Sequence, residues 1–298
     1  MTSMLNKPMS IVMHRETDTL YIVDSNNNRI LKMNNNSNIT ERVSFNNRSI
    51  NGSLLRPEDL VLDRSGAMYI SDTGNNRIVK WSFKPEKSET ILNVQSPKGL
   101  YLLENKSYLY IVESSSYPTV IRFDLKSKTK QKVAGDNSRT VSGLSTLNLY
   151  GPIGIYVDKN ENIYVAESFA ARISRWGPGA GSGTRVAGNT GAVQGSGIAA
   201  LGTPTSVFVD DQGSMYITDM TQNQTLRWAK GAKSPECLIG CTWVLDANRS
   251  VLVRANETIR PYDIAFDSRF NLYALESAQN KVKRFRLYLN LTCGKFFI

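Results

Sequence analysis

Residues 57–78 read PEDLVLDRSGAMYISDTGNNRI, and this stretch decides the fold. Pro57 precedes a short apolar segment, Leu60–Leu62, which ends at Asp63 in a turn that also contains a glycine. Aspartate and glycine at these places are typical of tight hairpin turns. A second run, Met68–Asp72, follows the turn and carries a tyrosine before its terminal acid. The stretch therefore predicts two antiparallel strands joined by a hairpin.

The same unit occurs six times along the chain. Each copy has an apolar strand with a tyrosine and a terminal acid, and a proline lies 12 or 13 residues before the tyrosine. The tyrosines are Tyr21, Tyr69, Tyr110, Tyr164, Tyr216 and Tyr273, and the prolines are Pro8, Pro57, Pro97, Pro152, Pro204 and Pro261. Two anchors that keep a nearly fixed distance through six copies indicate a repeat architecture.

Each unit continues into a third and a fourth strand. The third strand alternates apolar and polar residues, as in Arg77–Trp81 and Arg172–Trp176. Weaker fourth strands are expected at 41–45, 89–94, 131–134, 185–187 and 242–246. Short strands that are apolar on both faces near the start of each unit suit blades stacked around an axis.

The pattern predicts an all-β fold, a six-bladed β-propeller of four-stranded antiparallel blades. A single domain would span residues 1–298, with blades beginning near the six prolines. The last blade needs a fourth strand from either end of the chain, and we expect the C-terminal tail, Leu289–Ile298, to supply it.

Composition narrows the classes of function. The 298 residues carry a formal net charge of +10, spread evenly, which is compatible with acidic partners or simply with a soluble basic surface. No apolar stretch is long enough for a membrane span, so we expect a monomeric domain without membrane insertion. The single histidine, His14, argues against a histidine-based triad or a multi-histidine metal site. No cofactor is expected.

Two features bear on the cellular compartment and point in opposite directions. Asn-x-Ser/Thr sequons favour a secreted protein or an ectodomain bearing glycans. The N-terminal residues lack the apolar core of a signal peptide, which is expected of a cytoplasmic protein or of a piece of a longer chain. The sequon asparagines are Asn35, Asn38, Asn47, Asn51, Asn105, Asn223, Asn248, Asn256 and Asn290. Cys237 and Cys241 flank a possible tight hairpin that could carry one disulfide.

The repeat resembles the NHL repeat family. The residues that carry the resemblance are Pro57, Asp63, Gly66, Tyr69, Asp72, Asn75, Asn76, Arg77 and Ile78 in the second unit and Tyr21, Asp24, Asn27, Asn28, Arg29 and Ile30 in the first. The third and fifth units depart from it, with Ser115–Pro118 and Gln222–Gln224 in place of Asn-Asn-Arg. The resemblance implies a six-bladed propeller and leaves the function open, because one fold carries many functions.

Two sets of polar residues are candidates for chemistry. The acid that ends the second strand and the base five residues later, as in Asp72 and Arg77, could form a charged rim, but their repetition favours a structural ion pair. Asp59 and Asp263 lie two residues after their prolines, where the six first strands meet at one mouth of the channel. Related propellers include metal-dependent lyases and lactonases, so this pair is the candidate metal site of a hydrolase or lyase.

A third set suits a partner-binding face. The loops that lead into the first strands and the loops between the second and third strands should emerge on the same face of a propeller. Basic and aromatic residues gather there, and they are Lys7, Arg56, Glu58, Lys98, Tyr117, Tyr150, Phe169, Arg260 and Tyr262. Such a face suits a protein partner, which would make the chain a non-catalytic interaction scaffold or ligand-binding module rather than an enzyme. It also suits single-stranded RNA, which some NHL propellers bind.

Overall fold

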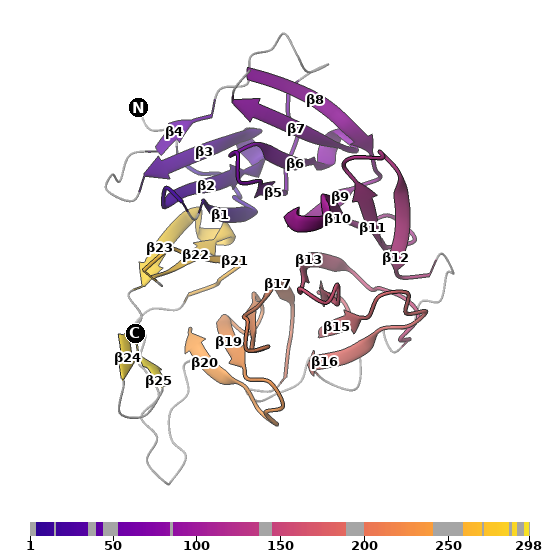
Figure 1. The fold of residues 1–298 in the computed structure, drawn as a ribbon. Helices are drawn as coiled ribbons and strands as arrows, with labels where there is room; N and C mark the ends of the chain where they lie inside the picture. The colour runs from indigo at the N-terminus through magenta and orange to yellow at the C-terminus, as the bar shows by residue number, and fades with distance from the viewer. Residues whose placement is uncertain are drawn as a thin grey trace.

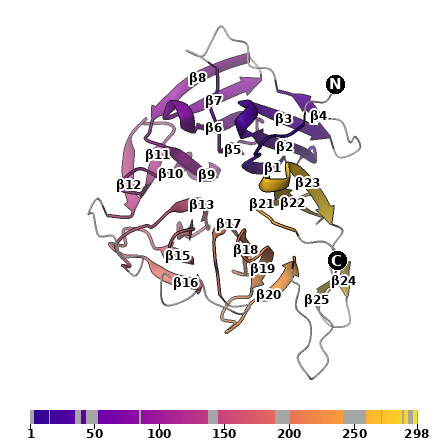
Figure 2. The ribbon, with the colours of Figure 1, turned by 180° about the vertical axis from the view of Figure 1, so that it is seen from behind.

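Six small antiparallel sheets stand around a central axis, and the innermost strand of each sheet is the one that follows the proline (Figure 1). The computed structural model describes residues 4–14, 16–34, 40–43, 53–83, 86–136, 145–188, 200–240, 259–269, 271–285, 288–290 and 295–297. The view from behind shows the same ring (Figure 2), which confirms the predicted six-bladed β-propeller.

The strands follow the repeat closely. Blades one and two comprise β1 (Ser10–His14), β2 (Thr19–Asp24), β3 (Arg29–Asn34), β4 (Thr40–Arg42), β5 (Asp59–Leu62), β6 (Met68–Asp72), β7 (Arg77–Phe83) and β8 (Glu86–Asn93). Blades three and four comprise β9 (Pro97–Leu103), β10 (Tyr108–Glu113), β11 (Thr119–Asp124), β12 (Lys130–Ala134), β13 (Pro152–Val157), β14 (Ile163–Glu167), β15 (Arg172–Trp176) and β16 (Thr184–Gly188). Blades five and six comprise β17 (Pro204–Val209), β18 (Met215–Asp219), β19 (Gln224–Trp228), β20 (Glu236–Ile239), β21 (Asp263–Phe266), β22 (Leu272–Glu276) and β23 (Lys281–Phe285).

The hydrophobic core lies between the blades. Side chains of a strand alternate between its two faces, so each blade has one apolar face for each neighbour. In β2, Leu20 and Ile22 pack against blade six, whereas Tyr21 and Val23 pack against blade two. The repeated tyrosine thus belongs to the core shared with the following blade, and this role explains why it recurs in every unit.

The ring closes through packing of blade one against blade six. Ile11, Leu20 and Ile22 contact Tyr273 and Leu275 across this junction. Backbone and side-chain hydrogen bonds to Asp263 add polar contacts between β1 and β21. No strand is exchanged between these two blades within the described part of the chain.

The expectation that the C-terminal tail completes blade six is wrong for the described residues. Its two short strands, β24 (Tyr288–Asn290) and β25 (Lys295–Phe297), pair with each other as a separate hairpin outside the ring (Figure 1). Among the described strands, β23 is therefore the outermost of blade six. The apolar junction between blades one and six closes the ring without a strand from the tail.

The fourth strand of blade five also differs from the prediction. The sequence predicts this strand at 242–246, which lies outside the described residues, whereas β20 occupies Glu236–Ile239. A tight turn makes the earlier start possible, because Ala232 donates its N–H to the Ala229 carbonyl at 3.0 Å and Gly231 has a φ of 77°. Cys237 lies within β20, which pairs with β19, and it is disulfide-bonded, whereas Cys241 lies outside the described residues.

Candidate functional site

One face of the ring is built from two kinds of loop, which are joined by backbone hydrogen bonds in blades one to five. We call it the loop face. It consists of the loops between second and third strands, at 25–28, 73–76, 114–118, 168–171, 220–223 and 277–280, and of the described residues that lead into the first strands, at 4–9, 53–58, 94–98, 145–151, 200–203 and 259–262. Backbone hydrogen bonds join the two kinds, for example from Ser168 N–H to the Gly151 carbonyl at 2.8 Å.

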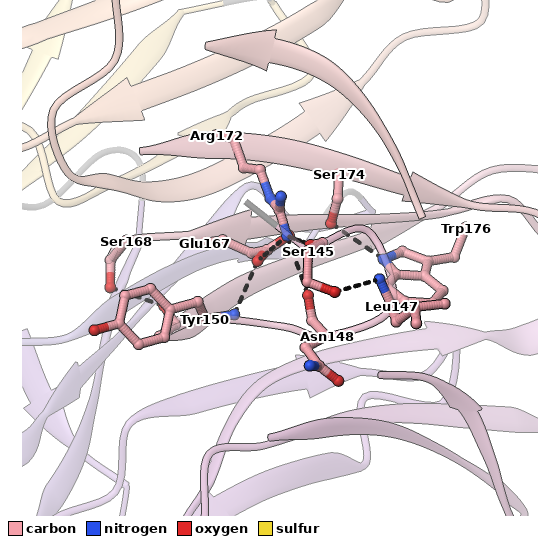
Figure 3. Close-up of polar contacts among 10 residues, drawn as sticks. Ser145, Leu147, Asn148, Tyr150, Glu167, Ser168, Arg172, Ser174 and Trp176 are labelled. Atoms are coloured by element: carbon pink, nitrogen blue, oxygen red, sulfur yellow. Dashed lines mark hydrogen bonds and ion pairs between the residues drawn. The ribbon is translucent and has the colours of Figure 1, made fainter. Parts of the chain in front are cut away.

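A buried acid holds these loops together in blade four (Figure 3). Glu167 is fully buried and receives the Tyr150 N–H at 2.9 Å from the leading segment. The Arg172 guanidinium donates to both Glu167 oxygens, at 3.0 and 2.9 Å, and to the carbonyls of Ser145 and Asn148. One ion pair thus fixes a leading segment against a second-to-third loop.

All six blades contain this contact in some form. The acids Asp24, Asp72, Glu113, Glu167, Asp219 and Glu276 accept backbone N–H groups from Asn6, Leu55, Gln95, Tyr150, Gly202 and Arg260, respectively. An arginine completes the contact in blades one, two and four, and a lysine lies 3.4 Å away in blade six. The structural interpretation of these acid and base pairs is confirmed, and they do not form an exposed rim.

The two blades that depart from the repeat replace the missing arginine in different ways. In blade three, Thr119 donates its hydroxyl to Glu113 at 3.2 Å. In blade five, Asp219 receives backbone N–H groups from Gly202, Thr203 and Gln222. The carboxylate at the end of the second strand therefore keeps its hydrogen bonds even where the Asn-Asn-Arg sequence is lost, both for the half-buried Glu113 and for the buried Asp219.

The repeated asparagines link neighbouring blades. Asn75 donates to Asp72 at 2.8 Å inside its own loop, and Asn76 adopts a left-handed conformation with φ 52°, which asparagine tolerates better than most residues. The Asn76 side-chain oxygen then receives the Ser96 N–H of blade three at 2.8 Å. Asn28 and Asn280 make the same contact with the blades that follow them, so each loop is fixed on both sides.

The residues predicted for a partner-binding face divide into exposed and half-buried groups. Lys7, Arg56 and Arg260 are exposed, as are Tyr117, Tyr150 and Phe169, whose exposed fractions are 43%, 37% and 66%. Glu58 and Lys98 are half-buried and form an ion pair at 2.6 Å between blades two and three. Tyr262 is half-buried at the mouth of the channel. The structure brings Tyr150 and Phe169 together edge to face, with ring centroids 5.6 Å apart.

Exposed apolar side chains are concentrated on the loop face. Of the eight large hydrophobic residues that are exposed in the described chain, seven lie there: Met4, Leu55, Tyr117, Leu147, Tyr150, Phe169 and Met220. The eighth, Phe83, ends β7 on the opposite side. Sequence reasoning missed Met4, Leu55, Leu147 and Met220. Met4 and Leu55 lie shortly before a repeat proline and Met220 directly follows a second-strand acid, so the positions of these three could have identified them.

The channel mouth contains the two candidate metal-binding acids, and each of them connects its blade to a neighbouring blade through hydrogen bonds. Asp59 accepts the Leu60 N–H at 2.8 Å and the Leu100 N–H of blade three at 2.7 Å. Asp263 accepts the Ile264 N–H and, from blade one, both the Ile11 N–H and the Ser10 hydroxyl. Both oxygens of each carboxylate therefore have partners, and no group of three potential metal ligands occurs in the described residues.

Burial and mutual repulsion make this pair hard to ionise. Burial raises the pKa of Asp59 to about 7, and the neighbouring charge of Asp263 contributes in the same direction. The pKa of Asp263 is also raised by burial, although backbone and serine hydrogen bonds oppose the shift. The Asp59 carboxyl is therefore expected to stay protonated up to about pH 7.

This titration predicts a pH dependence of stability that Asp59→Asn removes. The folded state binds the Asp59 proton more tightly than the unfolded chain, so ionisation destabilises the fold as the pH rises through about 4 to 7. Between pH 5 and pH 8, the wild type should lose on the order of 2 kcal/mol of unfolding free energy relative to Asp59→Asn. Urea denaturation at four pH values measures the difference. A difference that is constant, or that moves in favour of the wild type at high pH, contradicts the prediction.

Comparisons with known proteins identify the fold and nothing finer. No family model matches the chain, and no curated protein matches its sequence. A Bacteroides thetaiotaomicron protein of unknown function is 14% identical with a TM-score of 0.71, over 95% of this chain and 70% of that one. A catalytically inactive variant of virginiamycin B lyase from Staphylococcus aureus, solved with quinupristin, is 13% identical with a TM-score of 0.61, over 100% of this chain and 85% of that one.

A third similar structure comes from a protein assembly. A chain of the nidogen and laminin complex is 15% identical with a TM-score of 0.57, over 75% of this chain and 76% of that one. These neighbours include both a lyase and a member of a protein complex. At such low identities the similarity shows a β-propeller and leaves the function to be argued from the site.

Proposed function

We propose that the chain is a non-catalytic binding module that presents its loop face to a protein partner. The observation that carries the proposal is the placement of seven of eight exposed large hydrophobic residues on that one face. Exposed apolar residues gathered on one side of a soluble protein mark interaction surfaces, and aromatic residues dominate the binding energy of such surfaces. Tyr117, Tyr150 and Phe169 are the expected anchors.

The loop face is also held in one conformation, which favours binding. Each second-to-third loop is tied to its own leading segment by the acid that ends the second strand, and three of the loops are tied to the next blade by an asparagine. A surface that is ordered before binding loses little conformational entropy when the partner arrives. The polar side chains at the channel mouth, in contrast, are occupied in hydrogen bonds between blades, which supports a structural role for that region.

We further propose an NHL-type propeller in an oxidising compartment. The roles of Asp72, Asn75, Asn76 and Arg77 support the NHL assignment, because each of these repeated residues has a specific hydrogen bond in the loop. The disulfide at Cys237 supports a secreted protein or an ectodomain, where such bonds persist. Asn105, in the third-blade hairpin, is an exposed sequon asparagine and a candidate for glycosylation. Of the helices in the described ranges, none could span a membrane.

Site-specific photo-cross-linking tests the proposed face. A benzophenone amino acid would be placed at Phe169 on the loop face or at Phe83 on the opposite side, in protein expressed in its own cell type. We expect a defined protein adduct from position 169 and none from position 83. With the partner purified, Phe169→Ala should weaken binding roughly 10- to 100-fold, as for a typical anchor residue, and Phe83→Ala should leave affinity unchanged. Equal effects at the two positions would refute the proposal.

A further inference from the structure

Three cations occupy equivalent positions on neighbouring blades. Arg260, Lys7 and Arg56 each lie immediately before the proline that begins the first strand, in blades six, one and two. All three are exposed, and their side chains make no ion pair with any residue that the structure describes. In the other three blades this position holds Ser96, Gly151 and Thr203, so the cations gather on one half of the loop face. We call them the cationic arc.

The backbone of the cationic arc is fixed by the same contacts that order the loops. The Lys7 N–H donates to Asn280 at 2.7 Å, and the Arg56 N–H donates to Asn28 at 2.7 Å. The Arg260 N–H donates to the buried Glu276 at 3.0 Å. Lys7 and Arg56 share the same left-handed conformation, with φ 48°. All three charged side chains therefore leave the ring from anchored backbone, and those of Lys7 and Arg56 do so from equivalent points.

Acidic residues do not compensate the cationic arc locally. The second-strand acids are bound by backbone N–H groups, and the second-to-third loops contain no charged residue. Glu58 is paired with Lys98. Near the loop face, Asp136 follows blade three and lies 4.0 Å from Lys132, away from the cationic half. The exposed and unpaired charge of the described loop face is thus positive and confined to blades six, one and two.

We infer that the partner of this chain docks an acidic segment on the cationic arc. The inference rests on the proposed function and adds the chemistry of the partner. The aromatic anchors Tyr117, Tyr150 and Phe169 lie on blades three and four, so one ligand would place apolar groups there and carboxylates over blades six, one and two. Complementary charges at such a rim speed association and fix the orientation of the complex.

A protein segment suits this division better than single-stranded RNA. In RNA recognition, aromatic stacking platforms and phosphate-binding cations alternate closely, because each base is joined to its own phosphate. Here the cations and the aromatic rings occupy different halves of the face. A folded or extended protein can present acidic and apolar groups in separate patches.

Peptide selection tests the inference with a defined probe. Random 16-residue peptides displayed on phage would be selected on the full chain, and the enriched sequences synthesised with a fluorescent label. Affinities would be compared for the wild type, for a triple variant with Lys7→Gln, Arg56→Gln and Arg260→Gln, and for a matched triple variant with Lys126→Gln, Lys128→Gln and Lys130→Gln. The second triple removes the same charge from exposed lysines in the turn between β11 and β12 and at the start of β12.

We expect enriched peptides to combine aspartate or glutamate with aromatic residues. At about 0.1 M salt the arc triple variant should bind them about tenfold more weakly, whereas the matched triple should stay within about twofold. Peptides without acidic bias, the absence of any enriched peptide, or equal effects of the two triples would overturn the inference. If Phe169→Ser abolishes binding and the arc triple variant does not, the proposal that the loop face binds the partner is supported, and the inference that the partner is acidic is wrong. Tight binding of a labelled 12-nucleotide RNA that the arc triple abolishes would assign the arc to nucleic acid instead.

Discussion

Replacing Arg172 with methionine is expected to lower the free energy of unfolding by about 3–5 kcal/mol, the range found when one partner of a buried ion pair is removed. Glu167 is fully buried and would lose its counter-charge, while the carbonyls of Ser145 and Asn148 would lose a donor. Urea denaturation followed by circular dichroism measures the loss. Faster amide exchange at 145–151 would show that the leading segment has come loose.

An exposed ion pair provides the control for this prediction. Arg64 pairs with Glu104 at 3.0 Å, but the Arg64 side chain is 83% exposed, so Arg64→Met should cost less than about 1 kcal/mol. The double variant Arg172→Met with Glu167→Gln should recover part of the loss, because a neutral amide oxygen can still accept the Tyr150 N–H. A single Arg172→Met variant within 1 kcal/mol of the wild type would contradict the role given to this pair.

Gly154→Ala is expected to destabilise the ring by about 3 kcal/mol, at the upper end of the usual cost of overpacking. A Cβ atom at this position would lie 2.5 Å from the Thr205 carbonyl oxygen and 2.9 Å from the Ser206 Cα atom, both backbone atoms of the next blade. Neither can rotate away, so blades four and five would have to separate. Gly99 stands in the same relation to the Ile153 carbonyl of blade four.

Gly181 offers a matched control on the same blade. A Cβ atom there meets no heavy atom within 4 Å, so Gly181→Ala should be neutral or slightly stabilising. Thermal unfolding of the two variants makes the comparison directly. Equal melting temperatures for Gly154→Ala and Gly181→Ala would show that the inner strands are not as close as the structure has them.

The first three strands of nearly every blade could be predicted because the residues that repeat in them have specific structural roles. The proline begins the innermost strand or lies two residues before it, the tyrosine packs into the next junction, and the acid binds the leading segment. The fourth strands lack such a residue, since they lie at the rim of the blade. For this reason the sequence pattern predicts the fourth strand of blade five at 242–246, whereas β20 spans Glu236–Ile239.

The candidate site was predicted only in part, for a different reason. The basic and aromatic residues were found because loop positions follow from the repeat. The repeat does not tell which of the charged side chains has an ionic partner. Glu58 and Lys98 form an ion pair with each other, whereas Lys7 and Arg56 have no ionic partner among the described residues. Likewise, the position of Asp59 was predicted, but its bond to the Leu100 N–H depends on how closely two blades approach.

Amide hydrogen exchange of the chain, free and bound to the partner that cross-linking identifies, locates the binding surface. Protection on binding should be confined to the loop face, with the largest change in peptides that cover 114–118, 147–151 and 168–171. The hairpins on the opposite side, at 63–67, 158–162 and 210–214, should exchange as in the free protein. Protection centred on those hairpins, with the loop face unchanged, would contradict the proposed function.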